Sequence, residues 1–393
     1  MPTIGETTRP GFVYDSATDT WIPVGIGPHS HTPAAIGAIS SSLVTTKGDL
    51  IVATGSGTVV RQGVGADGSV LMADSSQADG VNWAGPSNTA GKNVLINGAM
   101  DWWQRGTSFA ATPANFTYMS DRWYWIGATA SVIQETSIVP TNFRYAIKAT
   151  ATGTTQPVFG QTIETANCYQ LAGQTVTLSA WVATSNASDV TLRLEFSTSV
   201  DNPSNGTWTT ITSTSGSNSV SATSTMARRS LVFSVPANAL SLRVTIYTSG
   251  NVSSGTTLTM TGAQLELGSV ATAFSRAGGS IGGELTLCQR YYYRATSAVV
   301  NVWFGVGNAG ASNAFYPMVS YKTTMRSSLS SIDYSNLGWW NGGSVTVASS
   351  ININQSAPDF AMLTVNTSGL TAGNSYMLGT GSGGGFIGFN AEL

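Results

Sequence analysis

Along many short segments of this chain, apolar residues alternate with polar ones, and this period of two limits the possible fold more than any other feature. In residues 175–182 every second side chain is apolar, and in residues 191–196 the apolar Leu192, Leu194 and Phe196 share one face. Such alternation is typical of antiparallel strands that bury one face. Gly, Ser, Asn and Asp residues between the segments favour tight turns. The sequence therefore predicts an all-β protein.

The longest series of such segments lies in residues 94–280 and predicts one large domain. Turn residues divide it into seven strand candidates, which are residues 144–149, 158–164, 175–182, 190–196, 229–235, 241–247 and 257–267. Many antiparallel strands joined by turns are typical of two packed sheets. We therefore predict a central jelly-roll-like β-sandwich whose alternating apolar residues form its core.

The first 93 residues contain only short strand candidates. Residues 1–46 are rich in Gly, Pro and Ser and predict an extended region with one hairpin around residues 15–19. Residues 47–93 predict a small β unit of four short strands. Domains this small bury little apolar surface on their own. We therefore expect this part to associate with further chains.

One segment departs from the period of two. Residues 283–294 place Leu285, Cys288 and Tyr292 at positions i, i+3 and i+7. This spacing predicts an amphipathic helix of about three turns within a connecting segment, residues 281–296. Such helices from several chains could pack round an axis, or a single helix could cap one edge of the sandwich.

Residues 297–393 predict a C-terminal β-sandwich tip domain. Its strand candidates are residues 299–306, 312–318, 331–334, 344–348, 361–365 and 375–378. The chain ends with a glycine turn followed by the apolar Phe386, Ile387 and Phe389. We expect this terminal segment to pair within a sheet.

The composition narrows the possible functions. Only 9% of the residues are charged, against about 25% in ordinary soluble domains, and the net charge is −2. A basic stripe for nucleic acid is therefore not expected. The chain contains no apolar run of about 18 residues, and its first residues lack a basic and apolar leader, so we expect neither membrane insertion nor a signal peptide.

The few cysteines and histidines limit the possible chemistry. Cys168 and Cys288 are the two cysteines, too few for a disulfide framework, and we expect both to be buried. The two histidines are His29 and His31. Because most acid–base catalysis uses His, the remaining chain offers no Ser-His-Asp or Cys-His site. We therefore expect a protein that is not an enzyme, although a mechanism based on carboxylates alone stays open.

Several segments resemble proteins of tailed bacteriophages. Residues 47–52 and 81–84 resemble the KGDLLVGTG…GLKW module of tail and fibre proteins. A second signature, NG…WQRGTSF…DRW, is similar to residues 97–98, 103–109 and 121–123. The QLELG…F…LCQRYY signature of the same group resembles residues 264–268, 273–274 and 287–292, and residues 389–393 resemble fibre C-termini. The chain is therefore identified as similar to receptor-binding tail fibre proteins.

This resemblance implies an elongated, intertwined homotrimer that forms part of the extracellular virion. In such fibres the N-terminus attaches to a tail or baseplate protein, and the distal part binds host surface polysaccharide or lipopolysaccharide. Residues 94–280 would be the carbohydrate-binding-like sandwich. Two alternatives stay open, a tailspike-type glycan depolymerase and a head or baseplate fibre with a mainly structural role.

Aromatic residues in the tip domain suggest a ligand-binding site. Exposed rings provide apolar walls for sugars, while nearby amides bind hydroxyl groups. Because neighbours in a strand point to opposite faces, Trp339 and Trp340 are not both buried in a one-sided sheet. We predict ligand binding by Trp339, Trp340, Asn341 and Tyr334, with the pair Trp339 and Trp340 the best candidate for exposure. The alternative is that these rings pack in the core or at a trimer interface.

Two further clusters allow a functional and a structural interpretation. His29 and His31 lie on one side of an extended chain and could hold a structural metal ion on the trimer axis, or be solvated. Asp101, Arg105, Asp121 and Arg122 could form a site, but buried ion pairs at the edge of a sandwich are the interpretation we favour.

Overall fold

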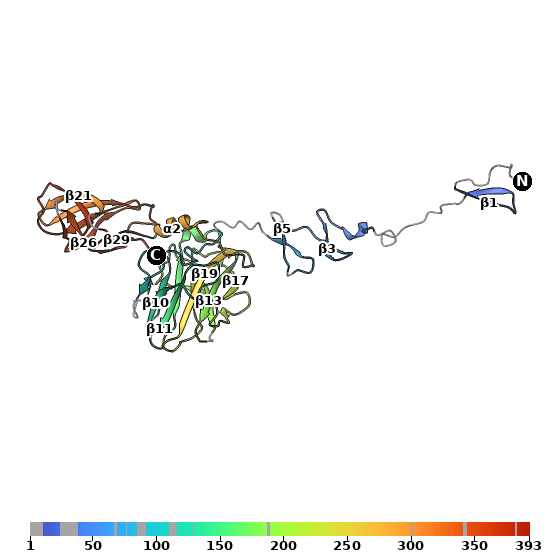
Figure 1. The fold of residues 1–393 in the computed structure, drawn as a ribbon, viewed down its shortest axis with the longest axis horizontal. Coiled ribbons are helices and arrows are strands. Elements are labelled where there is room, and N and C mark those ends of the chain that lie inside the picture. The colour runs from blue at the N-terminus through green and yellow to red at the C-terminus, as the bar shows by residue number, and fades with distance from the viewer. Residues whose placement is uncertain are drawn as a thin grey trace. The chain divides into compact units, whose positions relative to one another are not determined.

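The computed structural model of the chain describes residues 11–23, 38–66, 69–75, 77–84, 92–109, 116–127, 129–186, 189–299, 302–340, 344–381 and 383–393. The chain divides into two compact units, Met1–Ser87 and Asn88–Leu393. Strands dominate both units, and helical segments in the described residues are short (Figure 1). This confirms the predicted all-β class.

The unit Met1–Ser87 forms hairpins along its described residues. The paired strands are β1 (Phe12–Asp15) with β2 (Thr20–Pro23), β3 (Leu50–Gly55) with β4 (Thr58–Gln62), and β5 (Val70–Ala73) with β6 (Val81–Ala84). A single 3-10 turn, η2 (Ser41–Leu43), precedes β3 in the described chain. The N-terminal hairpin and the four short strands therefore form where the sequence predicts them.

These hairpins do not build a core of their own. No described residue of this unit is buried in the single chain. Its exposed apolar side chains are Val13, Ile22, Ile39, Val44, Leu50, Ile51, Val59, Val64, Val70, Leu71 and Met72. These short hairpins therefore bury little apolar surface on their own, as the sequence predicts, and their association with further chains stays a prediction.

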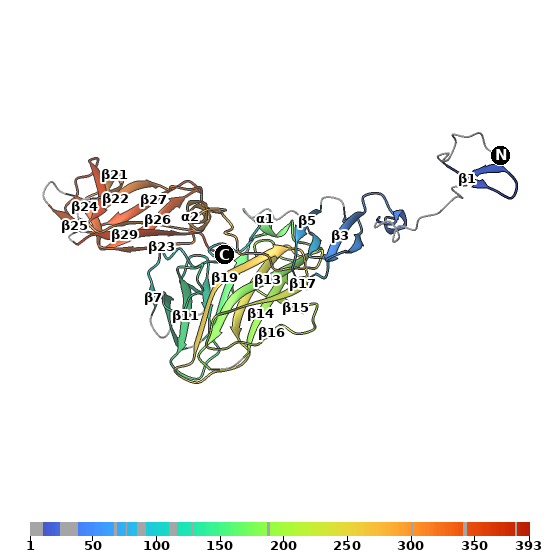
Figure 2. The same ribbon diagram turned by 45° about the vertical axis from the view of Figure 1, so that its right-hand side comes forward.

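The unit Asn88–Leu393 begins with a sandwich of two antiparallel sheets (Figure 2). One sheet, in spatial order, contains β17 (Ala227–Ser234), β13 (Thr175–Thr184), β19 (Thr257–Leu267), β11 (Ala146–Ala151), β10 (Ala130–Glu135) and β7 (Ser108–Phe109). The other contains β15 (Thr209–Ile211), β14 (Val190–Ser197), β18 (Ser241–Thr248), β12 (Val158–Ile163), β9 (Tyr124–Ile126) and β8 (Thr117–Tyr118), with β16 (Ser219–Val220) beside β14.

The sandwich core follows the period-two pattern. Leu178 and Val182 of β13 and Leu192 and Leu194 of β14 are fully buried, and they belong to one apolar cluster between the sheets. All seven strands predicted for this domain are present, with ends shifted by about one or two residues. The predicted jelly-roll-like sandwich is confirmed.

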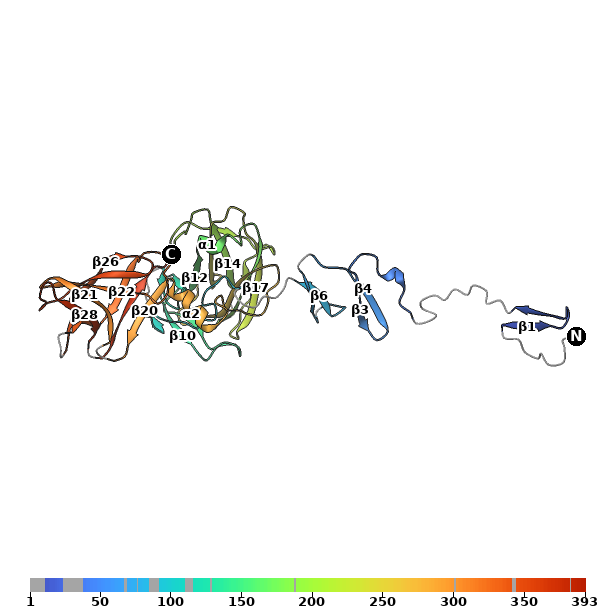
Figure 3. The same cartoon turned by 90° about the horizontal axis from the view of Figure 1, so that it is seen from above.

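The predicted connecting helix is shorter than expected. Helix α2 spans Ile281–Gln289 and begins at Ser280, whose hydroxyl accepts a hydrogen bond from Gly283 N (3.1 Å). The prediction that it continues to Arg294 is wrong, because Tyr292 to Ser297 form strand β20 beside α2 (Figure 3). Three consecutive tyrosines favour a strand. Cys288 packs at the centre of a small cluster with Ile96 and Tyr291, and the other cysteine, Cys168, is also free and buried.

The tip domain is a second two-layered β structure. Its larger sheet contains β25 (Val345–Val347), β24 (Leu337–Trp340), β28 (Ser375–Thr380), β21 (Trp303–Ala311), β22 (Ala314–Ser320), β27 (Phe360–Asn366) and β26 (Ser350–Ser356). The smaller contains β20 (Tyr292–Ser297), β29 (Gly385–Asn390) and β23 (Ser331–Ser335). The core between them includes Phe315, Leu363, Leu378 and Phe389. The terminal segment is paired as predicted, whereas β20, β24 and β26 are strands that the sequence analysis missed.

Candidate functional site

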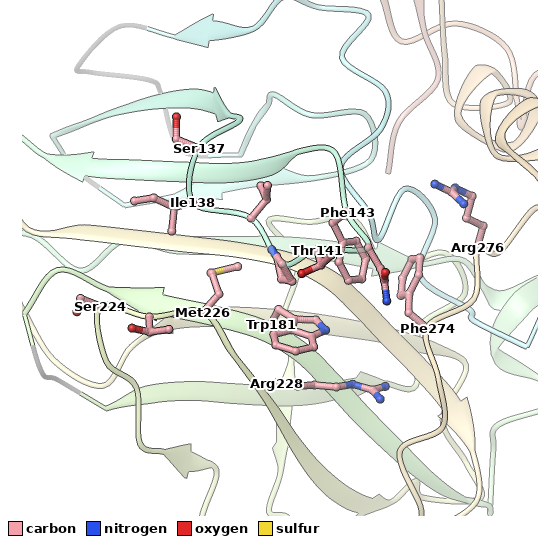
Figure 4. Close-up of a pocket in the computed structure, with 14 residues that line it drawn as sticks. Ser137, Ile138, Thr141, Phe143, Trp181, Ser224, Met226, Arg228, Phe274 and Arg276 are labelled. Atoms are coloured by element: carbon pink, nitrogen blue, oxygen red, sulfur yellow. The ribbon is translucent and has the colours of Figure 1, made fainter.

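The outer face of the six-stranded sheet of the central sandwich carries a groove of about 810 Å³. Trp181 of β13 forms its floor, since it alternates with the buried core residues Ala180 and Val182. Residues 137–143, between β10 and β11, form one wall, and residues 224–226 with Arg228 form another. Phe274 and Arg276, between β19 and α2, close one end of the groove (Figure 4).

A β-bulge in β19 shapes this floor. The pairing of β13 with β19 shifts register, so that Ser179 faces Gln264 while Trp181 faces Thr261. The extra residue is accommodated next to Gly262, which has a left-handed backbone (φ 60°). A Cβ atom on Gly262 would lie 2.6 Å from Phe143 Cζ and 2.8 Å from Trp181 Cδ1. The two rings therefore rest directly on glycine backbone.

Aromatic rings line the centre of the groove. Trp181 is partly exposed and lies near Phe143, and the rings of Phe143 and Phe274 meet edge to face with centroids 5.1 Å apart (Figure 4). Ile138 and Met226 extend the apolar surface to the other end (Figure 4). Partly exposed rings in a groove offer flat apolar surface to a ligand.

Polar groups surround the aromatic floor. Hydroxyl and amide side chains come from the two walls and are those of Ser137, Thr141, Asn142, Ser224 and Thr225. Hydroxyl groups donate and accept hydrogen bonds, and an amide does both at different atoms. No Asp or Glu occurs among the described residues that line the groove. The groove thus combines ring surfaces with groups that match the hydroxyls of a sugar.

The two arginines at one end of the groove are held differently. Arg228 Nη2 donates to Ser179 Oγ (2.9 Å) and to the carbonyl oxygen of Thr272 (2.5 Å). Burial lowers the pKa of the Arg228 guanidinium, and the nearby Glu266 carboxylate acts in the opposite direction. Arg276 Nε donates to Asp101 Oδ2 at 2.8 Å, with a little over a third of the arginine side chain exposed.

The tip residues predicted to bind a ligand lie in different environments. Trp340 is 37% exposed, and its ring centroid lies 5.7 Å from that of Trp303, which is equally exposed. Trp339 points the other way, as the alternation requires. It is 8% exposed, contacts Tyr376 edge to face, and its Nε1 donates to Ser368 O (3.1 Å). The structure thus assigns Trp339 a packing role.

Of the other two residues predicted to bind a ligand, the structure describes only Tyr334. Tyr334 belongs to the smaller sheet of the tip, and its hydroxyl accepts a hydrogen bond from Ile351 N (3.0 Å). Asn341 lies outside the described residues. The structure therefore does not place Tyr334 and Trp340 on one sheet, and ligand binding at these positions stays a prediction.

The predicted metal site cannot be placed. His29 and His31 lie outside the described residues. Within the part of the chain that the structure describes, no three His, Cys, Asp or Glu side chains gather in a group that could hold a metal ion. No helix in that part combines the length and the apolar character that spanning a membrane requires.

The charged residues of the middle signature form buried ion pairs. Arg122 pairs with Glu392, Arg105 lies 3.3 Å from Glu392 and 3.9 Å from Asp121, and Asp101 pairs with Arg276. The structural interpretation of this cluster is therefore confirmed for Arg105, Asp121 and Arg122. Asp101 alone connects to the groove, through Arg276.

Sequence reasoning missed the groove, although one signal was present. The alternation in residues 175–182 places Trp181 on the face opposite the core residues, among Thr and Ser. A large aromatic residue on the polar face of a strand indicates a surface contact. Phe143, Gly262 and Arg228 carry no such signal, since only the fold brings them beside Trp181.

Comparisons with known proteins give a partial likeness to solved structures. No protein-family model matches the chain, and no curated protein matches its sequence. A domain of tailspike protein 4 from bacteriophage CBA120 is 13% identical, with a TM-score of 0.30 over 45% of this chain and 21% of that one. This chain thus spans about a fifth of the tailspike domain's length.

Two carbohydrate-binding modules are also similar. TmCBM61, solved in complex with β-1,4-galactotriose, is 12% identical, with a TM-score of 0.29 over 45% of this chain and 99% of that one. The xylan-binding CBM22-1 domain of Xyn10C from Paenibacillus barcinonensis is 12% identical, with a TM-score of 0.28 over 47% of this chain and all of that one.

Proposed function

We propose that this chain is a receptor-binding tail fibre protein of a bacteriophage, and that its central sandwich binds a glycan of the host surface in the groove above Trp181. The observation that carries the proposal is the pair of rings, Trp181 and Phe143, which rest on Gly262 and open into a groove of about 810 Å³. The fibre role is supported by the sequence signatures along the chain.

The groove suits a sugar in shape and in chemistry. Its volume lies within the range of small-molecule sites, at about 300–1,000 Å³. The partly exposed ring of Trp181 would stack on the apolar face of a pyranose, while Thr141, Asn142, Ser224 and Thr225 would bind its hydroxyls. A flat apolar floor with polar walls is what a chain of sugar rings requires.

Binding without hydrolysis is the mode that we propose. Hydrolysis of a glycosidic bond generally uses two carboxyl groups that flank the bond, about 5–9.5 Å apart. No carboxylate occurs among the described residues of the groove lining. In the tip, Asp333 accepts a hydrogen bond from Tyr292, Asp359 accepts one from Thr324, and Glu392 pairs with Arg122. These arrangements favour a binding protein over a depolymerase.

Assembly as a homotrimer is the second part of the proposal. The exposed apolar residues of Met1–Ser87, such as Leu50, Leu71 and Met72, would be buried by the same region of two further chains. Residues 1–46 would attach the trimer to a tail or baseplate protein. A second glycan contact on the tip is supported by the exposed pair Trp303 and Trp340.

The substitution Trp181→Ala tests the proposed site. We expect it to weaken binding of the purified protein to host cells by about tenfold or more, because it removes the stacking surface. Trp208→Ala is the matched control, since Trp208 lies on the same sandwich, outside the groove and against Arg243. Binding that is equally affected in both variants, or in neither, would count against the groove.

A further inference from the structure

The charge of the groove is uneven. Arg228 and Arg276 both line it, and they lie at the same end as Phe274, away from Ile138 and Ser224 (Figure 4). The described lining residues include no acid, and the acids nearest to the two arginines, Asp101 and Glu266, lie outside the lining. The chain has only 17 Lys and Arg residues among 393, and two of them present guanidinium donors at one end of this groove.

Arg228 brings a charge that its surroundings neutralise only in part. Its hydrogen-bond partners are a hydroxyl and a carbonyl oxygen, and among the described residues no carboxylate lies within 4.0 Å of it. Its Nε is buried without a hydrogen-bond partner there. Glu266, the acid that acts on it from β19, also has Lys92 Nζ at 3.8 Å and accepts a hydrogen bond from Thr272 N (3.0 Å).

The ion pair of Arg276 with Asp101 uses only one nitrogen of the guanidinium. This nitrogen is Nε, at 2.8 Å from Oδ2, and the side chain of Arg276 is 36% exposed. Asp101 itself is nearly buried, at 7%. Asp101 therefore orients Arg276 through Nε, and the two terminal nitrogens are not part of this bond. A guanidinium presents several donors in a fixed fork, which matches the oxygens of a carboxylate or sulfate group.

Resting on the glycan-binding function proposed above, we propose that the ligand of this groove is an anionic glycan. Its sugar rings stack on Trp181 and Phe143, and its carboxylate or sulfate substituents bind Arg228 and Arg276. The two arginines at one end of the groove thereby fix the direction in which the glycan lies. Neutral glycans would make the ring contacts without the charge-assisted hydrogen bonds.

Isothermal titration calorimetry of the full chain with matched pairs of glycans tests whether the ligand is anionic. The pairs are oligogalacturonate with its carboxyl-reduced form, and dextran sulfate with dextran. We expect the charged member of a pair to bind about tenfold more tightly at low salt, since charge-assisted hydrogen bonds are the strong ones. The carboxylate and sulfate pairs distinguish the two sources of charge.

Substitutions test which residues cause the preference for the charged glycan. We expect Arg228→Gln and Arg276→Gln each to reduce the preference for the charged member several-fold. Arg229→Gln is the matched control, because it removes the same charge from the next position of β17 and is not part of the lining. Thermal unfolding identifies any variant that fails to fold, and Arg276, with its exposed side chain, serves as the second variant.

Three outcomes would overturn the inference. In the first, both members of each pair bind equally well and Trp181→Ala abolishes that binding. The glycan-binding function then stands, but the preference for a charged ligand is refuted. A charge preference that neither arginine variant changes places the anion elsewhere. Binding to no member of the panel, with host-cell binding that still depends on Trp181, also contradicts an anionic ligand.

Discussion

Arg122 and Glu392, which are 270 positions apart, form an ion pair with both side chains almost completely buried. Arg122 Nη2 also donates to Thr162 O (2.7 Å), and its guanidinium carbon lies 3.5 Å from the centroid of the Tyr291 ring. Arg105 approaches Glu392 from a second side, at 3.3 Å. The C-terminal residues are thus fixed to the central sandwich through a shared buried charge.

Removing one charge of this pair is expected to destabilise the unit strongly. Glu392→Gln leaves Arg122 buried without its counter-charge, which costs about 3–5 kcal/mol of unfolding free energy. Urea-induced unfolding measures this loss. Asp359→Asn is the control, since Asp359 is an exposed acid of the same tip and should change stability by less than about 1 kcal/mol. Similar effects in both variants would contradict a structural role for the pair.

Asp121, beside this pair, is expected to make stability depend on pH. Burial raises the pKa of its carboxyl group to about 6, although Arg105 and the donors of Gln104 act in the opposite direction. In the unfolded chain the group titrates near 3.8. Between these two values the folded state therefore keeps a proton that the unfolded state releases, and the stability contributed by Asp121 is lost as the pH rises.

The variant Asp121→Asn, which does not titrate, isolates this effect. Relative to the variant, the wild-type protein should lose unfolding free energy from about pH 4 to about pH 6 and change little above that. Unfolding curves of both proteins at several pH values give the difference directly. A difference that stays constant over this range would show that Asp121 titrates as an exposed acid does.

The bulge at Gly262 is expected to control the shape of the groove and thereby ligand binding. Gly262→Ala places a Cβ atom 2.6 Å from Phe143 Cζ and imposes a left-handed conformation on alanine, at a cost of about 1–2 kcal/mol for the backbone alone. Gly255→Ala is the matched control, because its φ is also positive (85°) and nothing lies within 4 Å of the added atom. Binding should fall only in Gly262→Ala, whereas both variants should lose stability.

The strands of the sandwich could be predicted because their signal is local. In β13 the alternation of Leu178, Ala180 and Val182 with polar neighbours is sufficient to define a strand and its buried face. The same local reasoning failed at Tyr292, where a helical spacing was present but the pairing of β20 with β29, about a hundred positions away, determines the structure.

The candidate groove could be predicted only in part. Trp181 stands on the polar face of its strand in the sequence itself. Its contact with Phe143, however, depends on the register shift between β13 and β19 and on a turn beyond β10. The pair of Arg122 and Glu392 is likewise set by the tertiary fold. The composition shows that charged residues are few, but it does not show which of them pair.

A substitution of Trp340 distinguishes a ligand-binding site on the tip from the groove of the central sandwich. If the tip contributes to adsorption, Trp340→Ala should weaken host-cell binding by about tenfold, by loss of the ring surface shared with Trp303. Phe360→Ala is the control, because its side chain is equally exposed, at 37%, on a different strand of the same sheet. Binding that depends on Trp181 but not on Trp340 would assign recognition to the central sandwich alone.

The N-terminal hairpins are expected to hold the trimer together. Light scattering of the full chain should give three times the mass of one chain. A shortened chain that begins at Asn88 keeps the unit with its own buried cores, and we expect it to be folded and to have a lower mass, because it lacks the exposed Leu50, Leu71 and Met72. The triple substitution of these three residues by Ser in the full chain should have the same effect. A monomeric full chain would contradict the trimer, and an intact trimer of the triple variant would place the interface outside the hairpins.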